Sequence, residues 1–213
     1  MKRILRAEID EMEKRFRANF INALSGYKSA NLVGTRSADG QANLSIVSSV
    51  IHLGSNPPLL GMVMRPPSVT RHSYENILET KEFSLNHIAS PFFQQAHQTS
   101  ARYDREESEF EATGLTERAV ENWRAPAVDE APIRLGMRLV EDMPIPHNGT
   151  RFIIAEIAWV EMEEDFLSQD GFVDLEAANV VTISGLDRYL KPTSLGRLNY
   201  AKTDAPTSFL SKK

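Results

Sequence analysis

A short stretch from Arg65 to Ser73 carries side chains suited to binding a phosphate group. It contains Arg65 and Arg71, a Pro-Pro pair between them, and the hydroxyl groups of Ser68, Thr70 and Ser73. A phosphate needs fixed positive charge together with several hydrogen-bond donors, including the backbone amides of a helix start. The prolines stiffen the loop, so less conformational entropy is lost on binding. The other interpretation is an ordinary helix-capped surface loop with two solvated arginines.

A second polar segment runs from Asn43 to Ser49. Period-two alternation places Asn43, Ser45 and Val47 on one face of a strand. Ser48 and Ser49 then straddle both faces, which indicates a bulge or the end of the strand. Backbone amides and small polar side chains on such a strand can match the donor and acceptor edge of a flat ring such as a flavin. Alternatively, these residues occupy the solvated face of an edge strand.

Five further polar residues near these segments carry weaker signals. They are His72, Asn86, His97, Ser100 and Tyr103. The loop histidine could stack on a ligand or donate to it, although a single loop histidine is more often a bystander. The asparagine ends a strand, where it could contact a ligand or form a turn. The last three could approach a ligand or simply end and cap a helix.

Several classes of site are excluded by what the chain lacks. It has no cysteine, which removes disulfides, thiolate metal ligands and cysteine nucleophiles. Its five histidines show no His-x-x-x-His spacing, so we expect no metal site. There is no Gly-x-Ser-x-Gly motif of hydrolases and no Gly-x-Gly of a dinucleotide fingerprint. If a flavin binds, it should therefore be a mononucleotide rather than a dinucleotide, and we assign no catalytic residue.

Length and composition predict one cytoplasmic domain. The chain has 213 residues, and 41% of them are hydrophobic, which is enough for a core and argues against disorder. A net charge of -5 disfavours nucleic acid or an anionic membrane as the main partner. The apolar runs are far too short to span a bilayer. The charged N-terminus lacks the apolar core of a signal peptide.

Hydrophobic periodicity predicts a mainly β protein. The expected helices span residues 7–24, 70–80 and 90–100. The expected strands span residues 30–35, 42–53, 59–64, 83–88, 133–141 and 151–163. Asp39-Gly40 should form the first hairpin turn, whereas residues 102–129 read as irregular with Trp123 as their anchor. About six strands with two or three helices predict a closed antiparallel barrel with helical decoration.

The order of these features resembles the flavin reductase-like family of FMN-binding split β-barrel proteins. The hairpin, the Ser-rich strand, the Arg-Pro-Pro connection and the Leu85-Asn86 pair carry the resemblance, which is strongest from Gly34 to Asn86. The strings Gly-Leu-Asp-Arg-Tyr and Arg-Leu-x-Tyr-Ala near the C-terminus are similar to the flavoredoxin-like branch. The resemblance implies a single domain with an antiparallel, Greek-key split barrel. Its parts would be an N-terminal helix in residues 1–26, a barrel core in 27–163 and a C-terminal extension in 164–213.

The resemblance also implies function. It implies a homodimer that binds FMN and passes hydride from NAD(P)H to the flavin, with electrons going on to free flavin or another acceptor. The alternative is a noncatalytic FMN carrier that accepts electrons from a protein partner. The cofactor-binding residues would be Asn43, Ser45, Val47, Ser48, Ser49, Arg65, Ser68, Thr70, Arg71, His72, Ser73, Asn86, His97 and Ser100.

One motif of the family is missing. Many flavin reductases carry a Gly-Asp-His motif whose histidine is associated with nicotinamide binding, and Thr150 stands where that histidine is expected. This departure puts the use of NAD(P)H in doubt and leaves flavin binding intact. We expect Thr150 and Tyr103 to lie near the substrate. Lys191 and Arg197 are further candidates for reaching a phosphate.

Overall fold

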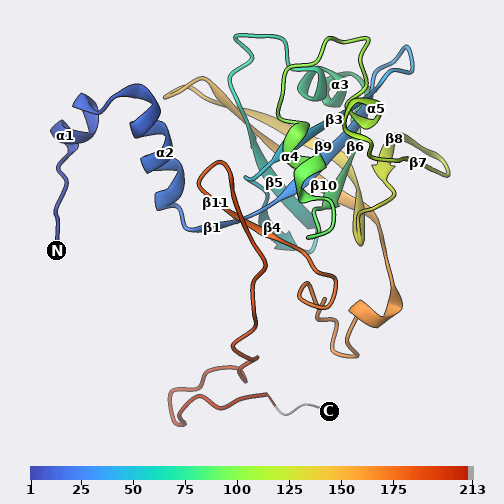
Figure 1. Cartoon of the computed structure of the whole chain (residues 1–213). Helices are drawn as coiled ribbons and strands as arrows, with labels where there is room; N and C mark the ends of the chain where they lie inside the picture. The colour runs from blue at the N-terminus through green and yellow to red at the C-terminus, as the bar shows by residue number, and fades with distance from the viewer. Residues whose placement is uncertain (211–213) are drawn as a thin grey trace.

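An antiparallel sheet of seven strands forms the body of the protein in this computed structural model, which describes residues 1–210 (Figure 1). The strands are β2 (Asn31–Arg36), β3 (Ala42–Val47), β4 (Ile51–Ser55), β5 (Pro58–Met64), β6 (Glu82–His87), β9 (Ile133–Ile145) and β10 (Thr150–Met162). Their order is β3-β2-β6-β9-β10-β5-β4, and every pair is antiparallel. The predicted antiparallel split barrel with helical decoration is confirmed.

The barrel does not close through a hydrogen-bonded ladder, which corrects one expectation. The predicted strand over residues 42–53 breaks into β3 and β4, and these two strands are the opposite edges of the sheet. At the break, the Ser49 hydroxyl donates to the Val63 carbonyl and accepts from the Val63 N–H, both at 3.0 Å. One side chain thus satisfies backbone groups that a continuing β4 would have paired. The strand end expected at Ser48 and Ser49 is confirmed.

Three helices pack on the sheet. They are α3 (His72–Thr80), α4 (Phe93–Gln98) and α5 (Glu109–Thr113). Glu109 reaches the free edge of β3, where its carboxylate accepts the Leu44 N–H at 2.8 Å. The buried side chains form two clusters on opposite faces of the strands, since neighbouring residues of β2, Leu32 and Val33, belong to different clusters. One cluster lies within the barrel around Met62, Phe83, Met137 and Ile153, and the other includes Leu32, Leu44, Phe92 and Phe110.

Residues 102–129 are more regular than expected. Besides α5 they contain the hairpin of β7 (Glu117–Val120) and β8 (Trp123–Val128). Trp123 does act as an anchor, because its ring meets Trp159 of β10 edge-on at 5.9 Å. The strands are short and β8 contains Pro126, so neither shows the alternation on which the sequence-based prediction relied.

A second, three-stranded sheet joins the two ends of the chain to the body. It consists of β1 (Tyr27–Ser29), β11 (Thr182–Ser184) and β12 (Arg188–Leu190). Val181 and Ile183 are buried in the cluster beneath α4, so the segment after the short helix η1 (Glu164–Phe166) contributes to the core. The extension beyond residue 163 is therefore partly integral to the fold.

The N-terminal region forms two helices where one was expected. They are α1 (Arg6–Glu11) and α2 (Lys14–Leu24), and the chain between them is extended at Met12. Glu13 causes the break, because its carboxylate caps α2 by accepting the N–H groups of Arg15 at 2.8 Å and Phe16 at 3.0 Å. Neither helix buries a residue, and both lie apart from the barrel (Figure 1).

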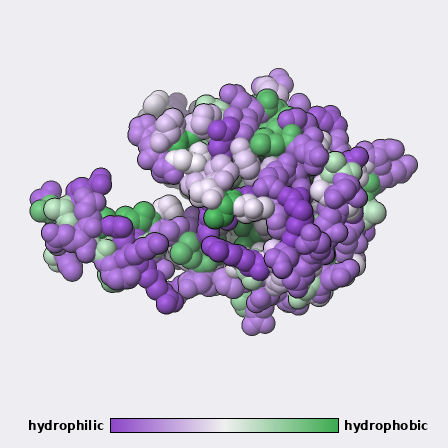
Figure 2. All heavy atoms as spheres, turned by 90° about the horizontal axis from the view of Figure 1, so that it is seen from above, coloured by the Kyte–Doolittle hydropathy of each residue, from purple (hydrophilic) through white to green (hydrophobic). Residues whose placement is uncertain are grey.

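Apolar side chains remain uncovered on these outlying segments. Figure 2 shows them on the N-terminal lobe, where Phe16 is 60% and Leu24 is 63% exposed. The segment after β12 also leads away from the body, and Tyr200 within it is 93% exposed. No helix within residues 1–210 has the length and apolar character that crossing a membrane requires.

Candidate functional site

The two segments singled out in the sequence meet at Ser73. Its hydroxyl accepts a hydrogen bond from Asn43 Nδ2 at 2.7 Å and lies 2.6 Å from the Ser45 hydroxyl. Asn43 and Ser45 share a face of β3 because side chains alternate along a strand, and that face is turned to the start of α3. Asn43 and Ser73 are each 6% exposed. This hydroxyl–amide cluster of Asn43, Ser45 and Ser73 is therefore a buried joint between β3 and α3.

An arginine group lies beside this joint. Arg71 precedes α3, and its Nε is buried without a hydrogen-bond partner. Burial lowers the pKa of Arg71, and the nearby charges of Arg65 and Arg102 lower it further. Within residues 1–210, none of these three arginines forms an ion pair with a carboxylate. The arginine group of Arg65, Arg71 and Arg102 is thus a concentration of uncompensated positive charge.

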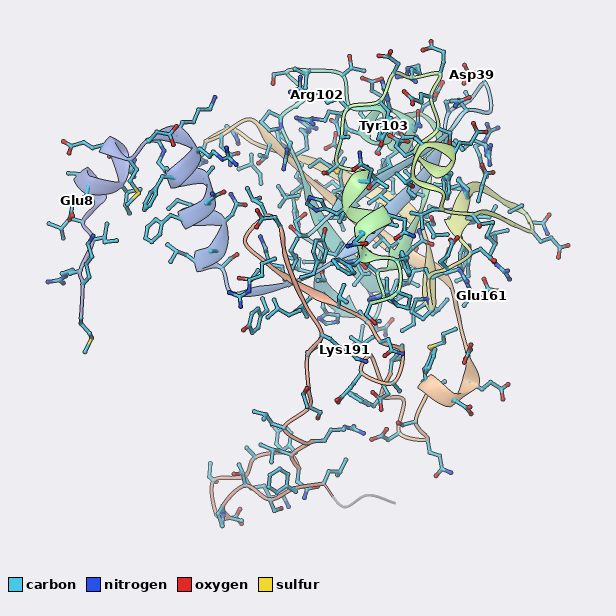
Figure 3. All side chains as sticks on the ribbon, viewed as in Figure 1. Glu8, Asp39, Arg102, Tyr103, Glu161 and Lys191 are labelled. Atoms are coloured by element: carbon cyan, nitrogen blue, oxygen red, sulfur yellow. The ribbon has the colours of Figure 1, made fainter. Side chains whose placement is uncertain are left out.

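Arg102 comes from a loop that sequence analysis had left out of the site. Figure 3 shows Arg102 and Tyr103 at the same end of the molecule as α3. Arg105 of this loop forms an ion pair with Glu75 of α3, and Gln41 Nε2 donates to the Glu106 carbonyl at 3.4 Å. No local pattern could have indicated Arg102, because 31 positions separate it from Arg71 and only the fold brings them together.

The connection from Arg65 to Thr70 borders the same site. Arg65, Ser68 and Thr70 are exposed, while His72 is half-buried as the first residue of α3. The turn between β9 and β10 lies against this connection, because an added Cβ on Gly149 would sit 3.7 Å from Pro66. Thr150 follows that turn and directs its hydroxyl to Asn148 Oδ1 at 2.7 Å. The structure therefore brings Thr150 close to the predicted phosphate loop.

An ion-pair network connects α3 with β9 and β10. Arg151 of β10 pairs with Asp142 of β9 through two contacts, at 2.8 and 2.6 Å, and the Tyr74 hydroxyl donates to Asp142 at 2.8 Å. Burial alone would raise the pKa of Asp142, but the hydrogen bonds from Arg151 and Tyr74 outweigh it and lower that pKa. Arg151 is thereby committed to a partner inside the protein. The network holds α3 against the β9–β10 hairpin.

Several predicted contacts already have partners within the fold. Asn86 is fully buried, and its amide donates to the Leu32 carbonyl at 3.2 Å and the Ser84 hydroxyl at 2.9 Å. Its oxygen accepts the Val128 N–H at 2.9 Å. The Asn86 amide is therefore occupied in joining β6, β2 and β8, and it offers no free donor to a ligand.

His97 and its neighbours are also engaged. His97 Nδ1 lies 3.0 Å from the Tyr189 hydroxyl, and burial raises the pKa of Tyr189 to about 12. The Tyr103 hydroxyl accepts from Gln98 Nε2 at 3.2 Å, and the exposed Ser100 follows the end of α4. These contacts agree with the interpretation that residues 97–100 end and cap a helix. Tyr103 lies on the same loop as Arg102.

The remaining predicted ligand-binding residues lie at the end of β3 and in the C-terminal segment. Val47 and Ser48 are half-buried where β3 ends, next to the Ser49 contact with β5. Lys191 donates to Asn179 at 2.7 Å and lies toward the opposite end of the molecule from Arg102 (Figure 3). Arg197 pairs with Asp170 at 2.7 Å.

The donor set fits an anionic group rather than a metal ion. In the described part of the chain, no three metal-ligating side chains gather. Arginine guanidinium groups bind phosphate with charge-assisted hydrogen bonds, and the unpartnered Nε of Arg71 is a donor without an acceptor. A phosphate would supply both the missing acceptor and the missing negative charge.

Comparison with known proteins places these features in a family context. The model of the flavin reductase like domain matches residues 27–176. A candidate flavin reductase with a split barrel domain from Shewanella frigidimarina NCIMB 400 is 50% identical. That structure superposes with a TM-score of 0.91 over 94% of this chain and 100% of its own.

Two more distant structures share the fold. Flavoredoxin of Desulfovibrio vulgaris (Miyazaki F) is 23% identical, with a TM-score of 0.69 over 84% of this chain and 91% of its own. An FMN-binding protein from Thermus thermophilus is 19% identical, with a TM-score of 0.63 over 78% of this chain and 86% of its own.

Proposed function

Because the chain belongs to the flavin reductase-like family, we propose that it binds one FMN per subunit and works as an oxidoreductase that reduces flavin with NAD(P)H. The observation that carries the proposal is the arginine group, in which Arg71 Nε is buried without a partner. A phosphomonoester carries about -1.5 to -2 charge at neutral pH. Arg65 and Arg71 would hold that phosphate, with exposed Ser68 and Thr70 as further donors.

The remaining residues would orient the cofactor. The half-buried end of β3, with Val47, Ser48 and Ser49, would face the ring edge, and His72 would lie beside it. The hydroxyl–amide cluster holds α3 to β3, and the Tyr74–Asp142–Arg151 network holds α3 to the β9–β10 hairpin. Bound FMN would supply the redox chemistry, namely hydride acceptance and onward electron transfer. The protein groups are needed for binding and orientation, which agrees with the absence of an assigned catalytic acid or base.

A ligand titration tests the cofactor. The protein should purify with FMN or bind FMN more tightly than FAD or riboflavin, measured by calorimetry or by quenching of flavin fluorescence. FMN should exceed riboflavin because only FMN offers the phosphate. Equal affinity for FMN and riboflavin would remove the arginine group from the cofactor site.

The electron donor is the second part of the proposal. Thr150 lies beside the phosphate loop, but its hydroxyl is directed to Asn148 and no histidine stands at this position. This observation favours the alternative, in which the protein is a noncatalytic FMN carrier reduced by a protein partner. Stopped-flow mixing with NADH or NADPH separates the two, because rapid bleaching of bound flavin supports the enzyme. Reduction by dithionite or a protein donor alone supports the carrier.

We also propose that the protein forms a homodimer with the flavin near the interface. Helices as short as α1 and α2 are marginal in water on their own, yet they bury no residue in the isolated chain. A second copy would cover Phe16, Leu24 and the apolar side chains beyond β12. Sedimentation should report a dimer, and Phe16→Ser with Leu24→Ser should weaken it. A stable monomer with full FMN occupancy would exclude the idea.

A further inference from the structure

The loop of residues 99–108 contributes Arg102 to the arginine group, although the positive charge of Arg102 repels Arg71. It carries Arg102, whose charge is close enough to Arg71 to disfavour the protonated form of Arg71. Like charges held close together cost free energy, and other favourable contacts must offset that cost. The loop must therefore be fixed by contacts elsewhere.

Three contacts fix it. The Arg105–Glu75 ion pair ties the middle of the loop to the first turn of α3. Gln41 Nε2 holds the Glu106 carbonyl at 3.4 Å, and Glu109 beyond the loop accepts the Leu44 N–H at 2.8 Å. Glu75 also accepts the backbone N–H of Arg71 at 3.3 Å. One carboxylate thus connects the loop with Arg71 itself.

From this arrangement we infer that Arg102 is a third phosphate-binding arginine and that the Arg105–Glu75 pair positions it, so that residues 99–108 select a phosphorylated flavin over an unphosphorylated one. The inference rests on the proposed function, since it deepens the same site. Two arginines roughly balance a phosphomonoester, and the third leaves the site attractive to the dianion. Binding would relieve the repulsion among the three guanidinium groups, so the phosphate contributes more than its contacts with Arg65 and Arg71.

The test compares the affinities of the wild type and three variants for FMN and riboflavin. Arg102→Ala should weaken FMN about tenfold or more, as expected for a charge-assisted hydrogen bond, and leave riboflavin within about twofold of wild type by the same scale. Arg102→Lys should recover part of the loss because the charge remains. Arg138→Ala is the matched control, since Arg138 is an exposed arginine paired with Glu82 beyond the C-terminal end of α3. It should leave both affinities unchanged.

The positioning role needs a double variant. Arg105→Ala should weaken FMN by no more than about fivefold, because the Arg105–Glu75 pair is partly exposed, and salt should diminish the effect. If Arg105 acts through Arg102, Arg105→Ala should add nothing in the Arg102→Ala background. Additive losses would show that Arg105 acts independently and would overturn its positioning role.

Failure of the inference about Arg102 can be distinguished from failure of the proposed function. If Arg71→Ala weakens FMN and Arg102→Ala does not, the phosphate site stands and the role of Arg102 is overturned. If Arg102→Ala weakens FMN and riboflavin equally, the loop acts on the structure of the site and the selectivity is overturned. If the wild type binds FMN and riboflavin equally, the proposed function itself fails at the phosphate site.

Discussion

The hydroxyl–amide cluster and the arginine group lie side by side, but their polar atoms are used differently. In the first, Asn43, Ser45 and Ser73 hydrogen-bond one another and are largely withdrawn from solvent. In the second, the Nε of Arg71 is buried with no acceptor among residues 1–210, and the charges of Arg65 and Arg102 disfavour its protonated form. A satisfied buried cluster stabilises a fold, whereas an unsatisfied one is costly until a ligand completes it.

The difference assigns separate roles to residues that look alike in sequence. Both groups are polar, and all of their members except Arg102 lie in segments that we expected to bind the cofactor. The hydroxyl–amide cluster joins β3 to α3, so its loss should reduce stability. The side chains of the arginine group have no ion-pair partner within residues 1–210, so their loss should reduce ligand affinity. Four changes test this contrast, beginning with the largest expected effect.

Arg71→Ala should separate affinity from stability most clearly. Removing a charge-assisted contact to phosphate costs roughly 1.5–3 kcal/mol, or about ten- to a hundredfold in FMN affinity. Stability of the ligand-free protein should stay constant or rise, because a half-buried guanidinium group with an unpartnered Nε and two like-charged neighbours is removed. Titration with FMN and riboflavin, together with urea unfolding, measures both quantities. Wild-type FMN affinity in both this variant and Arg65→Ala would place the phosphate elsewhere.

Ser73→Ala should reduce stability and leave the selectivity for FMN over riboflavin unchanged. It leaves Asn43 and Ser45 without their shared partner, and an unsatisfied buried group costs about 1–3 kcal/mol. Urea unfolding should show this loss, while the ratio of FMN to riboflavin affinity should stay near that of the wild type. Ser68→Ala on the exposed loop is the matched control and should leave stability unchanged. A changed ratio in Ser73→Ala would mean that the joint also contacts phosphate.

Acid should act through buried titratable groups of the scaffold. Burial lowers the pKa of His87 from 6.5 to about 4. Between these values the unfolded chain binds more protons, so stability should fall as the pH drops from 6.5 to 4. Glu109 affects the pH dependence of stability in the opposite direction. Burial raises its pKa, so its contribution to the free energy of unfolding is lost as the pH rises. Unfolding of His87→Gln across this range should show a weaker acid dependence than the wild type; an identical dependence would contradict the assignment.

Thr150→His should have the smallest effect. A recovered hydrogen bond contributes about 0.5–1.5 kcal/mol, so reduction by NAD(P)H should rise by about tenfold at most, chiefly through a lower KM. Stopped-flow reduction at several NADH and NADPH concentrations measures it, with Thr150→Ser as the control. If the rate does not change, the position does not correspond to the histidine of the family. If the wild type is not reduced at all by either nucleotide, the carrier replaces the enzyme.

Local patterns predicted the elements of the sheet well where the signal was strong. The Asp39-Gly40 turn joins β2 to β3, and the apolar runs near residues 59–64 and 83–88 became β5 and β6. Turn chemistry and alternation act over a few residues, so they can be read directly. The single N-terminal helix was wrong because the capping by Glu13 outweighed the apolar periodicity.

The sequence by itself therefore determined the antiparallel strands, the Arg-Pro-Pro break after β5 and the polar end of β3, because each depends on neighbouring residues. Only the tertiary structure decided which polar groups are free. In the folded chain Ser73 hydrogen-bonds Asn43, and Arg102 lies near Arg71. The amide of Asn86 hydrogen-bonds groups of Leu32, Ser84 and Val128. A residue type states what a side chain can bind, but whether its hydrogen bonds are already made depends on partners far away in the chain.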